Sequence, residues 1–268
     1  MPYAFHSDAA AKWQQQYLTT KNHILPFILK HHRLPANGTV LEIGSGEGGV
    51  LKAFAEHGFK GVGIELSQAR IEHAKNLFKD DEAGGLITFL AGDIHDTEKF
   101  AQFKGQMDLI VLKDAIEHIP DQERILAVLH QFLRKGGAVF LAFPPWHNPF
   151  GGHQQLAGSL LKFLPWFHIL PKPIYRGILN LFGETDVQIG VLMEIYDTRL
   201  STRKLERLLS KTCWQIKKRE FFLFNPIYEV KFGIKGRRQF RFLSRIPILR
   251  DFLSTGVYYL IEEATSAA

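Results

Sequence analysis

The feature that most constrains this chain is a glycine-rich turn that follows a short apolar run near residue 40. Residues 39–49 read TVLEIGSGEGG, which predicts a buried strand, a turn and then a helix. Glycines at positions 44, 46 and 48 carry no Cβ, so backbone amides there can approach a nucleotide-like ligand closely. Gly44, Gly46 and Gly49 also satisfy G-x-G-x-x-G, a pattern that fits dinucleotides and other adenosine-bearing cofactors alike.

The acidic residues around the turn favour a cationic ligand over a phosphate. Glu42 lies two residues before the first glycine, where a carboxylate would repel a pyrophosphate and attract a positive charge. S-adenosylmethionine carries a sulfonium and an ammonium group and no phosphate. Residues 60–65 predict a second strand that ends in Glu65, about 20 residues past the turn, and this spacing suits ribose hydroxyls in either type of cofactor.

Two further segments complete a pattern that resembles the class I S-adenosylmethionine-dependent methyltransferases, in their type 11/23-like branch. Residues 86–94 read LITFLAGDI, and residues 107–120 read MDLIVLKDAIEHIP, a fourth strand that runs into an "EHIP" segment. The resemblance covers about residues 36–143, with the motifs in the order of that family. It implies an α/β fold with a doubly wound, Rossmann-like sheet of seven strands, an antiparallel last strand and a helical lid insertion.

The resemblance also implies roles for individual residues. In that family the glycine turn contacts the methionine part of the cofactor, the acid that ends the second strand binds ribose, and the acid after the third strand binds adenine. By position these are Glu42, Gly44, Ser45, Gly46 and Gly48 for the turn, Glu65 with Leu66 for ribose, Asp93 with Ile94 for adenine, and Lys113 near the methionine end. The pair Lys113-Asp114 departs from the apolar or small polar pair of many relatives.

Three histidines are candidates for the proton acceptor that a hydroxyl substrate would need. His147 and His153 lie in a Pro/Gly-rich loop after the predicted fifth strand, and His118 follows the fourth strand beside Glu117. Histidine titrates near neutral pH and is a natural general base. The alternatives are that the loop histidines only pin their loop and that Glu117 and His118 only shape the cofactor pocket. We expect no metal site, because the histidines lack the i, i+4 or CxxC companions of zinc sites.

We expect the chain to consist of three segments. The first contains the cofactor site, and the second covers it. Residues 1–143 combine a leading amphipathic helix at about 8–32, with Asp8 as its N-cap, and the cofactor-binding half of the sheet. Residues 144–200 begin with prolines and glycines and continue into an apolar stretch at 160–182. We expect this second segment to form a helical lid over the substrate side.

The third segment, residues 201–268, returns to the sheet and carries most of the positive charge. Its two predicted strands are separated by residues 225–255, too many for a hairpin loop, which we expect to form a basic insertion. Residues 199–250 hold 15 basic and 3 acidic side chains, whereas residues 1–140 hold 15 and 17. Phenylalanines interleave with these cations, which suits an anionic membrane, an acidic substrate or nucleic acid. The alternative is a solvated cationic face with phenylalanines in the core.

These features favour a cytoplasmic enzyme that methylates a small molecule. The chain of 268 residues has one cysteine, Cys213, which excludes an intramolecular disulfide and suits a reducing compartment. Residues 160–170 are too apolar for an ordinary loop and too short to span a bilayer, so they suit an apolar acceptor or the inner face of a membrane. The leading hypothesis is O-methylation of a quinone, polyketide or lipid-linked intermediate by S-adenosylmethionine. An RNA-modifying methyltransferase and a non-catalytic cofactor-binding protein are the alternatives.

Overall fold

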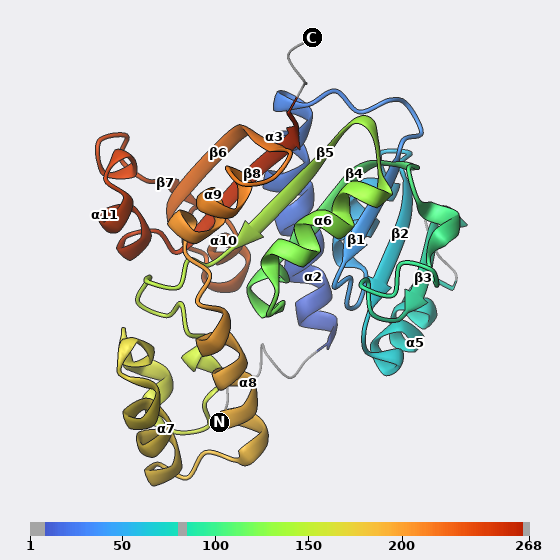
Figure 1. Cartoon of the computed structure of the whole chain (residues 1–268). Helices are drawn as coiled ribbons and strands as arrows, with labels where there is room; N and C mark the ends of the chain where they lie inside the picture. Colours follow the sequence, from blue (N-terminus) through green and yellow to red (C-terminus); the bar gives the residue numbers. More distant parts are fainter. Residues whose placement is uncertain (1–8, 80–84, 265–268) are drawn as a thin grey trace.

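The computed structural model of the chain describes residues 9–79 and 85–264, and its centre is a mostly parallel sheet of eight strands. The strand order is β3-β2-β1-β4-β5-β8-β6-β7 (Figure 1). The strands are β1 Thr39–Ile43, β2 Lys60–Glu65, β3 Ile87–Ala91, β4 Met107–Lys113, β5 Leu133–Phe143, β6 Trp214–Phe224, β7 Arg237–Arg238 and β8 Gly256–Glu263. Strands β1 to β5 pair in parallel, and β8 pairs antiparallel with both β5 and β6. The predicted α/β fold with an antiparallel last strand is confirmed.

Helices cover both faces of the sheet, because successive residues of each strand point to opposite sides. In β4, Ile110 and Leu112 pack on one face with α6 and α9, while Leu109 and Val111 pack on the other with α3, α4 and α5. Figure 1 shows α6 in front of the sheet and the first helices behind it. The helices of these layers are α2 Ala9–Thr19, α3 Leu25–His31, α4 Gly49–Ala55, α5 Gln68–Leu77, α6 Gln122–Phe132 and α9 Thr202–Leu209, with a π-helical turn Thr20–Ile24 between α2 and α3. Asp8, the expected N-cap, lies outside the described residues.

The sheet has one strand more than the seven expected. The additional strand, β7, belongs to the basic insertion and pairs antiparallel with β6, through Phe222 with Arg238 and Phe224 with Arg237. Without it, this part of β6 would be an open sheet edge with unpaired backbone groups. The prediction missed β7 because a two-residue strand has no alternation to read.

Residues 144–200 form a helical segment with a small core of its own. The apolar stretch at 160–182 is α-helical only in its second part, because Pro165 and Pro171 interrupt the first. Its elements are the 3₁₀ turns Leu160–Phe163 and Phe167–Ile169, then α7 Lys172–Leu181 and α8 Asp186–Thr198. A capping box of Thr185 and Gln188 begins α8. The segment's core includes Trp146, Leu161, Tyr175, Leu192 and Tyr196.

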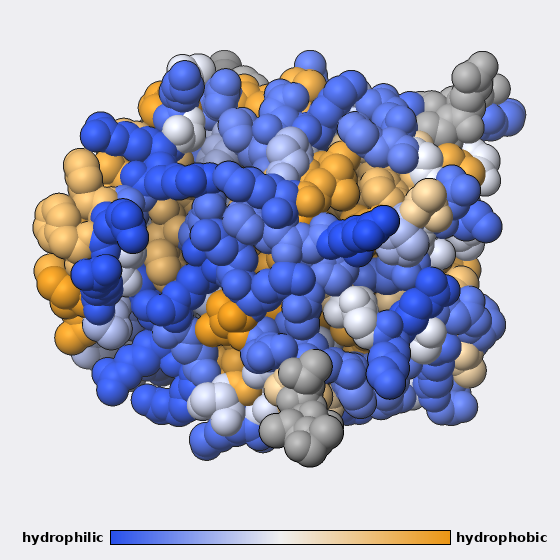
Figure 2. All heavy atoms as spheres, turned by 90° about the horizontal axis from the view of Figure 1, so that it is seen from above, coloured by the Kyte–Doolittle hydropathy of each residue, from blue (hydrophilic) through white to orange (hydrophobic). Residues whose placement is uncertain are grey.

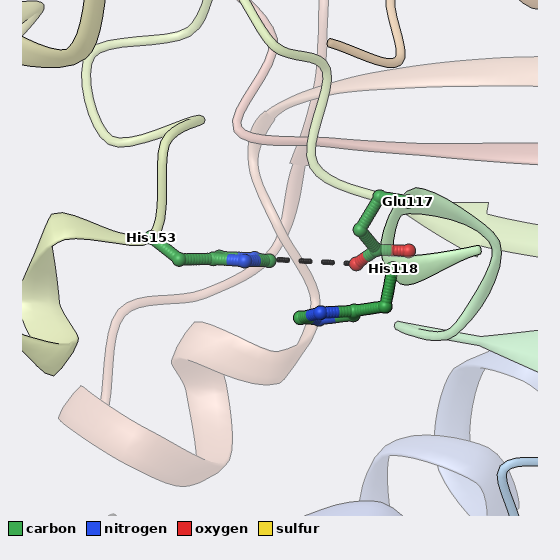
Figure 3. Close-up of side chains that lie close together, drawn as sticks. All are labelled: Glu117, His118 and His153. Atoms are coloured by element: carbon green, nitrogen blue, oxygen red, sulfur yellow. Dashed lines mark ion pairs between the residues drawn. The ribbon is translucent and has the colours of Figure 1, made fainter. Parts of the chain in front are cut away.

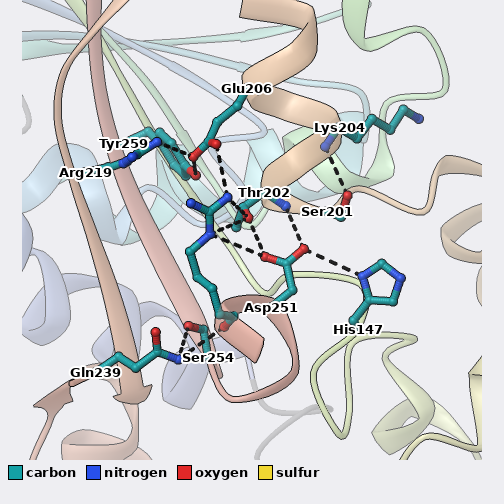
Figure 4. A network of polar contacts seen from close by, with 11 residues as sticks. His147, Ser201, Thr202, Lys204, Glu206, Arg219, Gln239, Asp251, Ser254 and Tyr259 are labelled. Atoms are coloured by element: carbon teal, nitrogen blue, oxygen red, sulfur yellow. Dashed lines mark hydrogen bonds and ion pairs between the residues drawn. The ribbon is translucent and has the colours of Figure 1, made fainter. Parts of the chain in front are cut away.

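A network of buried charged side chains holds the basic insertion against α9, which packs on the sheet. The insertion contains α10 Ile227–Phe232, a 3₁₀ turn Leu243–Arg245 and α11 Pro247–Phe252. From α11, Arg250 contacts Glu206 at 3.0 Å and Asp251 accepts a hydrogen bond from the Thr202 backbone amide at 3.1 Å (Figure 4).

Among the described residues, no helix is both long and apolar enough to cross a membrane.

Candidate functional site

The glycine turn between β1 and α4 depends on residues without a side chain. Gly44, Gly46 and Gly48 have φ angles of +75°, +52° and +80°, a region that L side chains rarely adopt. A Cβ on Gly48 would lie 2.5 Å from the ring of Phe89 on β3. A Cβ on Gly46 would collide with the guanidinium of Arg70 on α5. A side chain at any of these positions would therefore be strained, and at Gly48 it would also collide with the core.

A cavity of about 390 Å³ opens at the carboxyl ends of β1 to β4, where parallel sheets bind ligands. Six residues singled out from the sequence line it: Gly44, Glu65, Leu66, Asp93, Ile94 and His118. The structure therefore brings the predicted ribose acid, the predicted adenine acid and one histidine to the same hollow.

The other predicted cofactor residues, Glu42, Ser45, Gly46, Gly48 and Lys113, do not line this cavity. Glu42 is 1% exposed, and its Oε2 atom has no hydrogen-bond partner in the part of the chain that the structure describes. Burial raises the pKa of Glu42 well above its usual range, against the opposing effect of the nearby Lys113 charge. Lys113 is itself buried and donates a hydrogen bond from Nζ to Asp114 Oδ2 at 2.6 Å. A cation bound nearby would therefore favour the ionised form of Glu42.

The sequence did not reveal two residues that the structure places beside the glycine turn, Arg70 and Glu47. Arg70 donates hydrogen bonds to both carboxylate oxygens of Glu47, at 2.8 and 3.1 Å, and lies 3.3 Å from Glu65 Oε2. Although burial alone would raise the pKa of Glu47, the hydrogen bonds and charge of Arg70 lower it. Arg70 also lines the cavity. Its position five residues after Glu65, in the first turn of α5, was the available signal.

Backbone amides donate hydrogen bonds to the two acids that the sequence predicts to bind the cofactor, Glu65 and Asp93. Glu65 accepts from the backbone amides of Gly46, at 3.0 Å, and Ser67, at 3.1 Å. Asp93 accepts from the backbone amide of His95 at 2.9 Å, which lowers the pKa of the aspartate, and its side chain is 58% exposed. An ionised carboxylate held in this way is an acceptor for hydroxyl or amino groups of a ligand.

The structure brings two of the three candidate histidines together and leaves the third apart. His118 and His153 stack with ring centroids 5.2 Å apart and planes 12° from parallel. His147 instead lies with Nδ1 3.6 Å from Asp251 Oδ2 (Figure 4). Its ring stacks on that of Phe252. It lines a separate cavity of about 400 Å³ whose wall includes Arg199, Arg203, Lys204 and Arg207.

Glu117 completes a cluster with the stacked histidines (Figure 3). It is 3% exposed, neither carboxylate oxygen has a hydrogen-bond partner among the described residues, and Oε1 lies 4.0 Å from His153 Nε2. Burial, reinforced by the charge of Asp114, raises the pKa of Glu117 well above its usual range. Burial also lowers the pKa of His153 to about 3 and lowers that of His118. The expectation of no metal site rested on spacing along the chain, which does not detect a cluster assembled from two distant segments.

Comparison with known proteins points to one family. A family model described as a methyltransferase domain matches residues 11–173. An uncharacterised methyltransferase of Mycobacterium sp. (strain JLS) is 33% identical over 121 residues, which are 45% of this chain and 44% of that protein. A ubiquinone biosynthesis O-methyltransferase of Coxiella burnetii (strain Dugway 5J108-111) is 30% identical over 103 residues, 38% of this chain and 42% of that one. The chain thus spans less than half the length of these curated relatives.

A solved structure agrees with the sequence match at the level of the fold. The geranyl diphosphate C-methyltransferase from Streptomyces coelicolor A3(2), in a complex that contains S-adenosyl-L-homocysteine, superposes with a TM-score of 0.55. The superposition covers 89% of this chain and 79% of that one, at 15% sequence identity. The likeness therefore extends beyond the glycine turn to most of the chain.

Proposed function

This chain belongs to the methyltransferase-domain family, and on that premise we propose that it transfers the methyl group of S-adenosylmethionine to an oxygen atom of a lipophilic small molecule. The observation that carries the proposal is the cavity at the carboxyl edge of the sheet, which joins the glycine turn, two anchored carboxylates and a histidine. The resemblance in sequence to a ubiquinone O-methyltransferase supports oxygen as the attacked atom.

The residues around the cavity fit this cofactor. Gly44 leaves room at the turn, Glu65 would accept hydrogen bonds from ribose hydroxyls, and Asp93 would accept one from the adenine amino group. Glu42 lies beneath the turn with one oxygen unpartnered, so it can favour a positively charged ligand without touching it.

The reaction asks mainly for positioning. The bound cofactor supplies a methyl group on a sulfonium, which is a good leaving group, and the protein must hold the acceptor oxygen in line with it. Positioning of this kind can supply about 7–11 kcal/mol of the barrier. His118 lies at the edge of the cavity, so we place the acceptor against it and keep His118 and His153 as the catalytic candidates. His147 lines a different cavity and has no such support.

The exposed apolar side chains support an apolar acceptor that is met at a membrane. In the insertion Phe240, Phe242 and Ile248 are 46–65% exposed and lie near Arg237, Arg241 and Arg245 in the chain. Figure 2 shows hydrophobic side chains mixed with hydrophilic ones at the left edge of the molecule, the side on which Figure 1 places α11. Aromatic and basic side chains together suit the surface of an anionic bilayer. We therefore propose peripheral contact between this insertion and a membrane.

Nucleic acid is less well supported as the partner of the basic region. Arg219 and Arg250 both contact Glu206, at 2.6 and 3.0 Å, and Arg238 contacts Glu220 at 2.9 Å. These arginines are engaged within the protein. The phenylalanines divide in the same way, since Phe221 and Phe222 are buried while Phe240 and Phe242 are exposed. The burial of Phe221 and Phe222 supports the core interpretation for those two residues, and the exposure of Phe240 and Phe242 supports the proposed surface contact.

A label-transfer experiment tests the proposed reaction. The protein is incubated with S-adenosylmethionine carrying a radioactive methyl group and with fractionated cell extract, and Glu65→Gln serves as the impaired control. Label in the organic phase, reduced in the control, is the expected result. Label confined to nucleic acid or to water-soluble products would overturn the lipophilic acceptor, and no transfer at all would overturn the reaction.

Flotation with vesicles tests the membrane contact. We expect binding to vesicles that contain phosphatidylserine, weaker binding as salt rises, and loss of binding in Phe242→Ser. Leu77→Ser is the matched control, because Leu77 is 42% exposed on α5, away from the insertion. Equal flotation of both variants, or none by the unmodified protein at low salt, would contradict the proposal.

A further inference from the structure

We propose that Glu117, His118 and His153 form a binding site for one divalent first-row transition metal ion, such as Zn²⁺, at the edge of the cofactor cavity. One ligand atom from each of these residues lies within 4.8 Å of the other two. Two imidazoles and one carboxylate are a donor set that such ions use in proteins, often with a position left open for a further ligand. This inference goes beyond the proposed function and does not depend on the identity of the acceptor.

The donor atoms need only a small movement to close on an ion. With metal–ligand distances of 2.0–2.1 Å, neighbouring donors in a tetrahedral site are about 3.3 Å apart. Glu117 Oε1 and His153 Nε2 are 4.0 Å apart in the structure. Because the two rings lie nearly parallel, closing the site requires rotation of the side chains about their torsion angles. Figure 3 shows the Glu117 carboxylate directed at the His153 ring, with His118 lying parallel below that ring.

The state of Glu117 is the strongest sign that a ligand belongs here. A carboxylate that is 3% exposed, with both oxygens lacking a hydrogen-bond partner, is costly to bury and calls for a cation or a proton. A metal ion would use the carboxylate charge and the lone pairs of both rings at once.

The surrounding backbone holds the cluster in place. His153 has φ +54°, a left-handed conformation that a histidine adopts at some cost in energy. Its loop is fastened by Gln154, which is fully buried and donates a hydrogen bond to the Pro149 carbonyl at 2.9 Å. On the other side, Thr198 Oγ1 donates to the Glu117 carbonyl at 2.6 Å. Both halves of the site are thus positioned by contacts that the ion would not supply.

Because His118 also lines the cofactor cavity, the open position of the ion can face that cavity. A donor oxygen of the acceptor could then be the further ligand. Asp114, 38% exposed with φ +52°, lies at the same rim, and its charge acts on all three residues of the cluster.

Metal binding is measured on the full chain without cofactor or acceptor, so its outcome is separate from that of the label-transfer experiment. The protein is stripped with a chelator, dialysed against Zn²⁺, and its bound metal is counted. A parallel titration with Co²⁺ reports the ligands through visible absorption. We expect one ion per chain and a Co²⁺ spectrum that indicates nitrogen and oxygen donors.

Glu117→Gln and His153→Asn should each weaken Zn²⁺ binding by about 10-fold to 100-fold, the range seen when metal-site partners are removed. Both variants are chosen to fold, because Gln has the shape of Glu without its charge and Asn tolerates a left-handed backbone. His147→Gln is the matched control, since it removes a histidine that also faces a carboxylate but lies outside the cluster of Glu117, His118 and His153.

The melting temperature provides a second readout. Zn²⁺ should raise it in the unmodified protein and in His147→Gln and should leave Glu117→Gln unchanged, because a ligand that binds only the folded state stabilises it. The proposal is overturned if the unmodified protein binds no more Zn²⁺ than Glu117→Gln, or if His147→Gln loses as much binding as the two cluster variants.

Discussion

The acids at the carboxyl edge of the sheet are of two kinds, although they lie within one site. Glu47 and Glu65 are paired with Arg70, and Glu65 also accepts hydrogen bonds from two backbone amides. Glu42 and Glu117 are buried with unpartnered oxygens, and burial raises the pKa of each. Paired acids are fixed acceptors for neutral polar groups, whereas unpaired ones gain most from a cation.

This difference changes the electrostatic account of the site. From the sequence, a carboxylate beside the glycine turn was expected to attract a cationic cofactor directly. In the structure the cavity-lining Glu65 is partly neutralised by Arg70, whereas Glu42 is buried and does not line the cavity. The attraction for a sulfonium is therefore expected to depend on the ionisation of Glu42 and to be moderated by Arg70.

The backbone that positions the paired acids should be the most sensitive element. Gly48→Ala places a Cβ 2.5 Å from Phe89 at φ +80°, so it combines a strained conformation with a collision in the core. We expect a loss of about 2–5 kcal/mol in the free energy of unfolding, measured by denaturant titration. Gly183→Ala is the control, because Gly183 has φ +74° but open space around it. An equal loss in both variants would show that strain alone, and not the packing of the turn, sets the cost.

How much of the site the sequence reveals depends on how local each part is. The glycine turn, Glu65 and Asp93 were found because strand ends and glycines fix their surroundings over a few residues. The meeting of Glu117 with His153 could not be read, because it depends on how the loop after β5 packs against the end of β4. The same holds for β7 and for the contact of α11 with α9.

Removing a paired acid should impair cofactor binding without discriminating between cofactor forms. Glu65→Gln replaces a charged acceptor of ribose hydroxyls by a neutral one, and hydrogen bonds to charged groups contribute about 1.5–3 kcal/mol. We expect calorimetry to show about 10-fold to 100-fold weaker binding of both S-adenosylmethionine and S-adenosylhomocysteine. Glu72→Gln on the exposed side of α5 is the control. A loss confined to S-adenosylmethionine would mean that Glu65 recognises charge and not ribose.

The unpaired acid Glu42 should instead affect how stability depends on pH and how many protons are released when the cofactor binds. Because burial raises the pKa of Glu42, its contribution to stability is present below pH 4.5 and is lost as the pH rises through the raised value. Glu42→Gln should flatten this decline and be more stable than the unmodified protein at neutral pH by about 1 kcal/mol. A bound sulfonium should also favour the ionised form, so binding of S-adenosylmethionine should release protons. Calorimetry in buffers of different ionisation heat measures this release, which should be smaller for S-adenosylhomocysteine and absent in Glu42→Gln.

The smallest effect should come from removing the pairing itself. Arg70→Gln leaves Glu47 and Glu65 without their shared cation, which makes the turn more negative and favours the charged sulfonium over the neutral thioether. Since the Arg70 side chain is 41% exposed, its charge is screened by solvent, and we expect the ratio of the two affinities to rise only about 2-fold to 5-fold. Lys75→Gln on the same helix removes the same net charge away from Glu47 and should leave the ratio unchanged. If both variants shift the ratio equally, the turn responds to the overall charge of the protein, and the distinction between paired and unpaired acids does not govern cofactor choice.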